Sequence, residues 1–135
     1  RKSAEKGNAD AQYELAQCYL HGEGVPEDVD KSVRLELLAA AHGHRKAQSS
    51  VGDCYYIGLV VRQDFEEAVK WYRKAAAQGD PFAQHNLGKC YYNGHGVPKN
   101  YAEAVKWYRK SITWGVICEK PDAAEKEAER LVKRT

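Results

Sequence analysis

The sequence predicts an all-α protein, namely a solenoid built from stacked, antiparallel pairs of helices. The first observation is a repeat with a period of 36 residues, because the stretch from Ala83 to Gly115 recurs twice earlier in the chain. The second and third copies agree at 17 of 36 positions without a gap. The second observation is that each copy carries two helical patterns around a glycine-rich turn. A fixed period of this length, with two helices in each unit, is typical of helical solenoids.

The repeat frame also divides the chain into units. It predicts a partial repeat over residues 1–8, complete repeats over 9–44, 45–80 and 81–116, and a C-terminal capping helix over 117–135. Residues 1–8 align with 73–80, the end of a second helix, so we expect the chain to begin inside an earlier unit. We therefore expect a monomer or one part of a longer repeat protein. Pro121 to Val132 has a charged helical pattern suited to covering the open end of the array.

The first helix of each unit, called the A helix, is expected to begin near Asn8, His44 and Asp80. The pair Asp80-Pro81 is the clearest start, because Asp can cap the free N–H groups of the first turn and Pro has no N–H to lose there. One face of the A helix has the same apolar spacing in every copy. In the third copy this face consists of Ala83, Leu87, Cys90 and Tyr91.

The second helix of each unit, called the B helix, is expected to begin after Asp28, Asp64 and Asn100, which can cap its first turn. In the second copy the predicted buried stripe consists of Phe65, Ala68, Val69, Tyr72, Ala75 and Ala76, with Trp71 at its edge. Small residues on the A helix, namely Ala16, Gly52 and Gly88, leave room for the B helix to approach. Because each connection is short, consecutive helices must lie antiparallel.

The turn between the two helices of the second unit departs from its counterparts. Val60 stands where the other copies have Gly24 and Gly96. If those glycines adopt a positive φ, a β-branched residue cannot follow them at low cost. We therefore predict that the turn from Gly58 to Asp64 takes a different path from the other two turns.

Composition excludes several classes of partner. Lys and Arg number 21 and Asp and Glu 19, which leaves a formal net charge of +2. Both signs are interleaved along the predicted helices, so the charge pattern indicates no nucleic-acid binding. No apolar run approaches the ~20 residues that a membrane-spanning helix needs, which predicts no membrane insertion.

The cysteines are explained by the repeat. Cys18, Cys54 and Cys90 occupy one repeat position, and stacked helices place such positions about 8–10 Å apart, beyond the reach of a disulfide. We interpret them as small buried thiols rather than as a redox or metal ladder. Unpaired thiols favour a reducing, cytoplasmic compartment, although the sequence leaves the localisation open.

Other patterns that suggest chemistry are also explained by the repeat. His42-Gly43-His44 has two metal-ligand side chains, but the glycine ends a helix in every unit and no further ligands lie nearby in sequence. The glycine-rich turns connect helix to helix, whereas a phosphate-binding loop connects a strand to a helix. No nucleophile lies beside a histidine outside the repeat frame. We therefore predict no catalytic residue, no metal and no cofactor, and keep an envelope hydrolase or metal-binding protein as an alternative.

The residues shared by the copies are most complete in the third unit, which has Ala83-Gln84, Leu87-Gly88, Tyr91, Gly94, Gly96-Val97, Ala104, Trp107-Tyr108 and Gly115. This set resembles the Sel-1-like repeat, a relative of the tetratricopeptide repeat. The resemblance covers residues 1–116 and implies a right-handed α-solenoid. It also implies a non-enzymatic scaffold or adaptor, which is the general role of the family.

A solenoid of this kind is expected to place its A helices on the concave side. The A-helix positions that packing does not use would then line a groove, and these are Tyr13, Gln17, Leu20, Ser49, Asp53, Tyr56, His85, Lys89 and Tyr92. The row formed by Leu20, Tyr56 and Tyr92 offers the rigid contact area found at protein interfaces. Since related tetratricopeptide domains bind peptides or helices, we expect the groove to bind a peptide segment of a partner protein. The alternative is a structural spacer that joins flanking domains.

Overall fold

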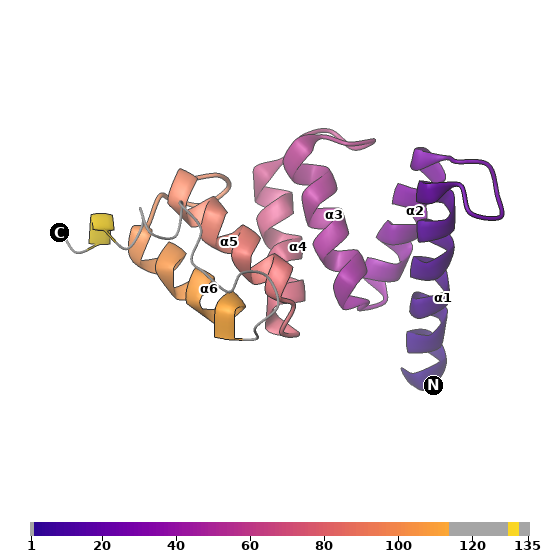
Figure 1. Cartoon of the computed structure of the whole chain (residues 1–135), viewed down its shortest axis with the longest axis horizontal. Coiled ribbons are helices and arrows are strands. Elements are labelled where there is room, and N and C mark those ends of the chain that lie inside the picture. Colours follow the sequence, from indigo (N-terminus) through magenta and orange to yellow (C-terminus); the bar gives the residue numbers. More distant parts are fainter. Residues whose placement is uncertain (1, 114–129, 133–135) are drawn as a thin grey trace.

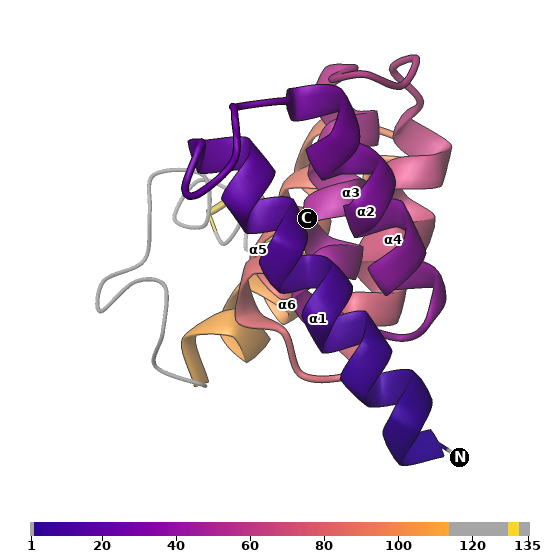
Figure 2. The same cartoon turned by 90° about the vertical axis from the view of Figure 1, so that its right-hand side faces the viewer.

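The computed structural model describes residues 2–113 and 130–132. Six helices follow one another along the chain: α1 (Lys2–His21), α2 (Val29–Ala41), α3 (Arg45–Ile57), α4 (Phe65–Ala77), α5 (Pro81–Asn93) and α6 (Tyr101–Thr113). They form three antiparallel pairs in a row, with α1 at one end and α6 at the other (Figure 1). Seen along the row, α1 lies in front of the later helices (Figure 2). The predicted all-α solenoid is confirmed.

The two helices of each later repeat pack through a glycine and a tyrosine. A Cβ atom added to Gly52 would lie 2.6 Å from Cδ1 of Tyr72, and one added to Gly88 would lie 2.6 Å from Cδ1 of Tyr108. Both rings are almost fully buried, with 2% and 0% exposure. The predicted room for the B helix is therefore occupied by these two rings.

Successive repeats stack by placing each A helix against the preceding B helix. Ala83, Leu87 and Cys90 of α5 are buried in one cluster with the apolar stripe of α4. Ala47 and Val51 of α3 are buried with residues of α2 in the same manner. The equivalent face of α1 is open, and Leu15 is 42% exposed. The buried core is thus a series of small clusters between neighbouring helices.

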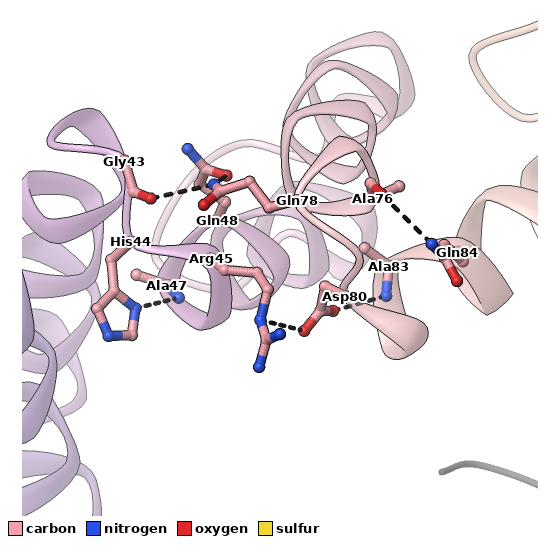
Figure 3. A network of polar contacts seen from close by, with 10 residues as sticks. All are labelled: Gly43, His44, Arg45, Ala47, Gln48, Ala76, Gln78, Asp80, Ala83 and Gln84. Atoms are coloured by element: carbon pink, nitrogen blue, oxygen red, sulfur yellow. Dashed lines mark hydrogen bonds and ion pairs between the residues drawn. The ribbon is translucent and has the colours of Figure 1, made fainter. Parts of the chain in front are cut away.

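Polar contacts stabilise the connections between repeats, and Figure 3 draws those of His44, Asp80 and Gln84. His44 and Asp80 cap α3 and α5, each accepting an N–H three residues further on. The buried Gln48 donates from its side chain to the Ala40 carbonyl at 3.2 Å. Gln84 repeats this bond one unit later, with the Ala76 carbonyl at 3.3 Å. The predicted starts of these two A helices are confirmed.

The first helix starts earlier than predicted. We expected an A helix from about Asn8, after a break at the end of an earlier B helix, but α1 begins at Lys2 and continues through Gly7 and Asn8. The N–H groups at the start of a helix lack carbonyl partners, and the upstream residues provide them by continuing the helix. The B helices do begin as predicted, because Asp28, Asp64 and Asn100 each accept an N–H of the first turn.

The prediction for the turn of the second repeat was wrong. Val60 has a φ of 67°, close to the 75° of Gly24 and the 76° of Gly96. The backbone bonds also match, because Leu59 donates to Cys54 O at 2.9 Å just as His95 donates to Cys90 O at 2.9 Å. These bonds satisfy carbonyls at the helix end. The turn therefore keeps its path and Val60 takes up the strain.

The far end of the array carries part of the predicted cap. Arg130 to Val132 is helical, and Val132 packs against the cluster formed by Ala104, Val105 and Tyr108 of α6. The rest of the predicted cap, residues 117–129 and 133–135, lies outside the described residues.

Candidate functional site

One hollow in the surface is a groove that crosses the three A helices. It has a volume of about 650 Å³. Its lining residues are Tyr13 from α1, Arg45, Lys46, Ser49, Ser50 and Asp53 from α3, Gly79 and Asp80 before α5, and Pro81, Phe82 and Asn86 from α5. We call this the A-helix groove. A second hollow of about 700 Å³ shares Tyr13, Arg45 and Lys46 with it and extends along Asp10 and Glu14 of α1.

Asp53 forms a polar centre in the A-helix groove. Its Oδ1 accepts a hydrogen bond of 2.5 Å from Tyr72 Oη and one of 3.2 Å from Asn86 Nδ2. Burial raises the pKa of the Asp53 carboxyl, while the Tyr72 bond and the nearby Lys89 act in the opposite direction. This carboxyl therefore joins α3 to α4 and α5 and is already engaged within the protein.

A second polar contact joins the starting points of α3 and α5. Asp80 Oδ1 lies 3.5 Å from Arg45 Nε, and Asp80 Oδ2 accepts the Ala83 N–H at 2.9 Å (Figure 3). The Asp80 side chain is 3% exposed, whereas that of Arg45 is 42% exposed. The ion pair therefore turns one edge of Arg45 towards Asp80 and leaves the rest at the groove.

His44 occupies the corresponding junction next to α1. Its Nδ1 accepts the Ala47 N–H at 3.1 Å, its Nε2 lies 3.2 Å from Asp10 Oδ1, and its ring stacks on Tyr13 at 4.5 Å. Because Nδ1 is an acceptor, the proton of the neutral ring sits on Nε2, facing Asp10. Burial lowers the pKa of His44, and Asp10 offsets part of this effect.

The structure brings only some of the predicted groove residues together. Tyr13, Ser49 and Asp53 line the A-helix groove, although Ser49 is only 7% exposed. Gln17 and Leu20 are half-buried on α1, Lys89 is exposed, and the His85 ring lies 5.2 Å from that of Tyr108. None of these four residues lines the A-helix groove.

The predicted row of Leu20, Tyr56 and Tyr92 is absent from the groove lining. The Tyr56 hydroxyl is 2.6 Å from His95 Nδ1, so it links the second repeat to the turn of the third. The Tyr92 ring lies 5.6 Å from that of Tyr101. Tyr56 is thus engaged by the next repeat, a contact that the pattern within one repeat does not reveal, whereas Tyr92 packs on the B helix of its own repeat.

Sequence analysis missed Lys46, Ser50, Phe82 and Asn86, which also line the groove. A usable signal existed, since the copies differ at these positions: Asp10, Lys46 and Phe82 share one repeat position, and Glu14, Ser50 and Asn86 share another. The predicted residues Ser49 and His85 directly precede Ser50 and Asn86 on the same helices, whereas Lys46 and Phe82 lie three residues before the predicted ones. An error of one residue rotates a side chain by about 100° around a helix.

Reactive side chains gather nowhere in the described part of the chain. Among residues 2–113 and 130–132, no group of three His, Cys, Asp or Glu side chains could hold a metal ion. Cys18, Cys54 and Cys90 are free thiols. Cys54 and Cys90 are buried as predicted, and burial raises the pKa of each to about 12, which keeps both thiols protonated. Cys18, also predicted to be buried, is only half-buried. None of the described helices is long and apolar enough to cross a membrane.

The stacked helix pairs and the groove across their A helices define a helical-repeat protein with an open groove on its surface. The Sel1 repeat family model matches residues 9–44, 45–80 and 81–113. The chain therefore belongs to the Sel1 repeat family, which confirms the resemblance read from the sequence. Sel1 repeats generally serve as protein–protein interaction scaffolds and are typically not catalytic.

Solved structures include similar proteins. A Sel1 repeat protein from Oxalobacter formigenes has 33% identity and a TM-score of 0.74, covering 98% of this chain and 97% of its own. The protective antigen c5321 of uropathogenic Escherichia coli has 40% identity and a TM-score of 0.76 over 83% of this chain. This chain spans 24% of c5321.

Helicobacter pylori cysteine rich protein B is a more distant structural neighbour. It has 23% identity and a TM-score of 0.67, covering 96% of each chain, and shows a likeness of fold alone. No curated protein matched the chain.

Proposed function

We propose that this chain is a non-enzymatic interaction module that binds a peptide segment of a partner protein in the A-helix groove. The observation that carries the proposal is the position of the groove across α1, α3 and α5. A ligand lying there would contact all three repeats at once.

The chemistry of the groove favours a peptide over a compact ligand. Asp53 and Asp80 are held by internal partners, so the groove keeps its shape without a ligand. Phe82 is 55% exposed, and an exposed aromatic side chain beside polar groups is typical of protein interfaces. The contacts of Asn86 with Asp53 and of His44 with Tyr13 bring neighbouring A helices to axial distances of about 8–10 Å, so two steps between helices span about six extended residues.

The test is selection from a phage library of random peptides of about twelve residues, twice the expected length of the ligand. The Asn86→Trp variant blocks the groove with a large side chain. Lys70→Trp is the matched control, because it places the same side chain on α4, where Lys70 is 68% exposed. We expect the unmodified protein and Lys70→Trp to enrich the same peptides and Asn86→Trp to lose them.

The opposite result would remove the proposal. If no peptide is enriched, or if Asn86→Trp retains the same peptides with an unchanged thermal unfolding curve, the groove binds no peptide. The structural spacer would then become the better interpretation of the array.

A further inference from the structure

One position of the repeat is occupied by a different kind of side chain on each A helix. Asp10, Lys46 and Phe82 are equivalent in the repeat frame and lie on α1, α3 and α5. All three are exposed: the Asp10 side chain to 60%, Phe82 to 55%, and Lys46 also in the exposed class. The two adjoining hollows are therefore lined in turn by a carboxylate, an ammonium group and an aromatic ring.

The two charges in this row are available to a ligand. Among the side chains that the structure describes, Asp10 has one polar contact, with the neutral His44, and Glu14 adds a second carboxylate one helical turn further along α1. Lys46 makes no ion pair within the described residues. The nearby Asp80 forms an ion pair with Arg45 and accepts the Ala83 N–H at the start of α5, so it does not neutralise Lys46.

The spacing of the row matches an extended chain. The A helices meet at the groove through side chains, because Asn86 of α5 bonds to Asp53 of α3 at 3.2 Å and the His44 ring, just before α3, lies 4.5 Å from that of Tyr13 on α1. Helices in side-chain contact have axes about 8–10 Å apart, and equivalent positions on them are separated by about the same distance. An extended peptide advances about 3.3 Å per residue, so one step along the row corresponds to about three residues. Opposite charges across an interface favour one register and disfavour others, which gives specificity as well as attraction.

We propose, building on the proposed function, that the groove selects an extended segment with three side chains about three residues apart. In order from α1 to α5 these are a basic side chain opposite Asp10 and Glu14, an acidic one opposite Lys46, and an aromatic or large aliphatic one against Phe82. The partner segment is thus defined by the order of its basic, acidic and apolar side chains. The peptide can run along the groove in either direction.

The phage selection described above also tests this order when it is repeated with two further variants. The unmodified protein is expected to enrich peptides that carry the basic, acidic and apolar residues in this order. Lys46→Glu is expected to change the preferred middle residue from acidic to basic. Phe82→Ala is expected to remove the apolar preference while the basic and acidic preferences remain.

A single enriched peptide, made synthetically and labelled, gives the quantitative test by fluorescence anisotropy. Lys46→Glu should weaken its binding by about tenfold, and replacing the acidic residue of the peptide with lysine should restore it. A glutamate in the first turn of α3 is compatible with the helix dipole, so this variant should fold. Lys106→Glu on α6 and Leu38→Ala on α2, which alter exposed side chains on B helices, should leave binding unchanged.

Failure of the inference is distinguishable from failure of the proposed function. If peptides are enriched and Asn86→Trp loses them, but they lack the order or ignore Lys46→Glu, peptide binding stands and the order is wrong. If the unmodified protein enriches no peptide, both fall together.

Discussion

The first repeat joins its A and B helices differently from the two repeats that follow. Each later repeat places a buried tyrosine ring directly against a glycine of the A helix, whereas the first repeat has Ala16 and Glu36 at these positions, both buried. A glycine inside a helix costs about 1 kcal/mol relative to alanine. The tyrosine ring explains why the later repeats tolerate that cost. The glycine and the tyrosine therefore pack as one unit, and where the first repeat lacks one of them it lacks the other as well.

The largest expected effect comes from removing a ring. Tyr72→Ala should lower the free energy of unfolding by about 3–5 kcal/mol, because Tyr72 is 2% exposed and its hydroxyl bonds to Asp53. Glu36→Ala, the equivalent change in the first repeat, should cost about 1 kcal/mol or less, since it also relieves the desolvation of a buried carboxyl. Urea unfolding followed by far-UV circular dichroism measures both. Equal losses would mean that the two kinds of repeat pack alike.

A smaller effect is expected from adding a single methyl group at the glycine. Gly52→Ala should destabilise the protein by about 2 kcal/mol, because its Cβ would lie 2.6 Å from both Cδ1 and Cε1 of Tyr72. The reverse change in the first repeat, Ala16→Gly, should cost the helix propensity of about 1 kcal/mol together with the loss of one buried methyl group. A Gly52→Ala protein that is as stable as the unmodified one would show that the Tyr72 ring can move aside.

Giving the first repeat the glycine and tyrosine of the later repeats tests whether these two residues depend on each other. Glu36→Tyr alone should be destabilising, because the Cβ of Ala16 occupies the space that the ring needs. Adding Ala16→Gly should recover stability, with a coupling energy of about 1 kcal/mol or more in a double-mutant cycle. Additive effects of the two changes would contradict the idea of a glycine–tyrosine unit.

The parts of the fold that sequence could predict are those encoded within one repeat. The A-helix stripe through Leu87, the cap at Asp80 and the small residue at Gly88 each have a local signal, and each lies where it was predicted. The links between repeats have no such signal. The bond between Tyr56 and His95 depends on how two units stack, so sequence analysis assigned Tyr56 to a groove that it does not line.

Only some of the residues that line the groove could be predicted from the sequence. Residues of the three A helices line the groove, and the predicted residues Tyr13 and Asp53 are among them. Phe82 and Lys46 were missed because the rotation of each helix is set by side-chain packing between units. That rotation requires the coordinates of both helices.

The turns offer a further comparison, with a gain of stability as the expected result. Val60→Gly should raise the free energy of unfolding by about 1 kcal/mol, because it removes a β-branched side chain from a φ of 67°. The gain is limited by the greater flexibility of glycine in the unfolded chain. Thermal unfolding checks this, with Gly24→Val as the reverse change that should be destabilising. A loss of stability on Val60→Gly would show that the exposed Val60 side chain makes a stabilising contact.

The smallest effect is expected at the starts of α3 and α5. The backbone geometry is the same at both, but the capping side chain is a histidine at one and an aspartate at the other. His44 has φ −69° and ψ 117°, and Asp80 has φ −68° and ψ 115°, and each accepts an N–H of the following helix. Burial lowers the pKa of His44 in the folded protein, whereas an unfolded histidine titrates near its ordinary value of about 6.5. The unfolded chain therefore binds a proton more readily at this residue.

His44 therefore makes its full contribution to the free energy of unfolding above a pH of about 6.5. This contribution is lost as the pH falls towards the lowered pKa that His44 has in the folded protein. Protonation of Nδ1 also removes the acceptor that caps α3. His44→Asp keeps an ionised acceptor down to a pH of about 4, so this variant should lose less stability than the unmodified protein between about pH 7.5 and 5.5. Because the other histidines are common to both proteins, their contributions cancel in the difference. Equal losses would mean that the acid sensitivity arises elsewhere and that the two caps are interchangeable.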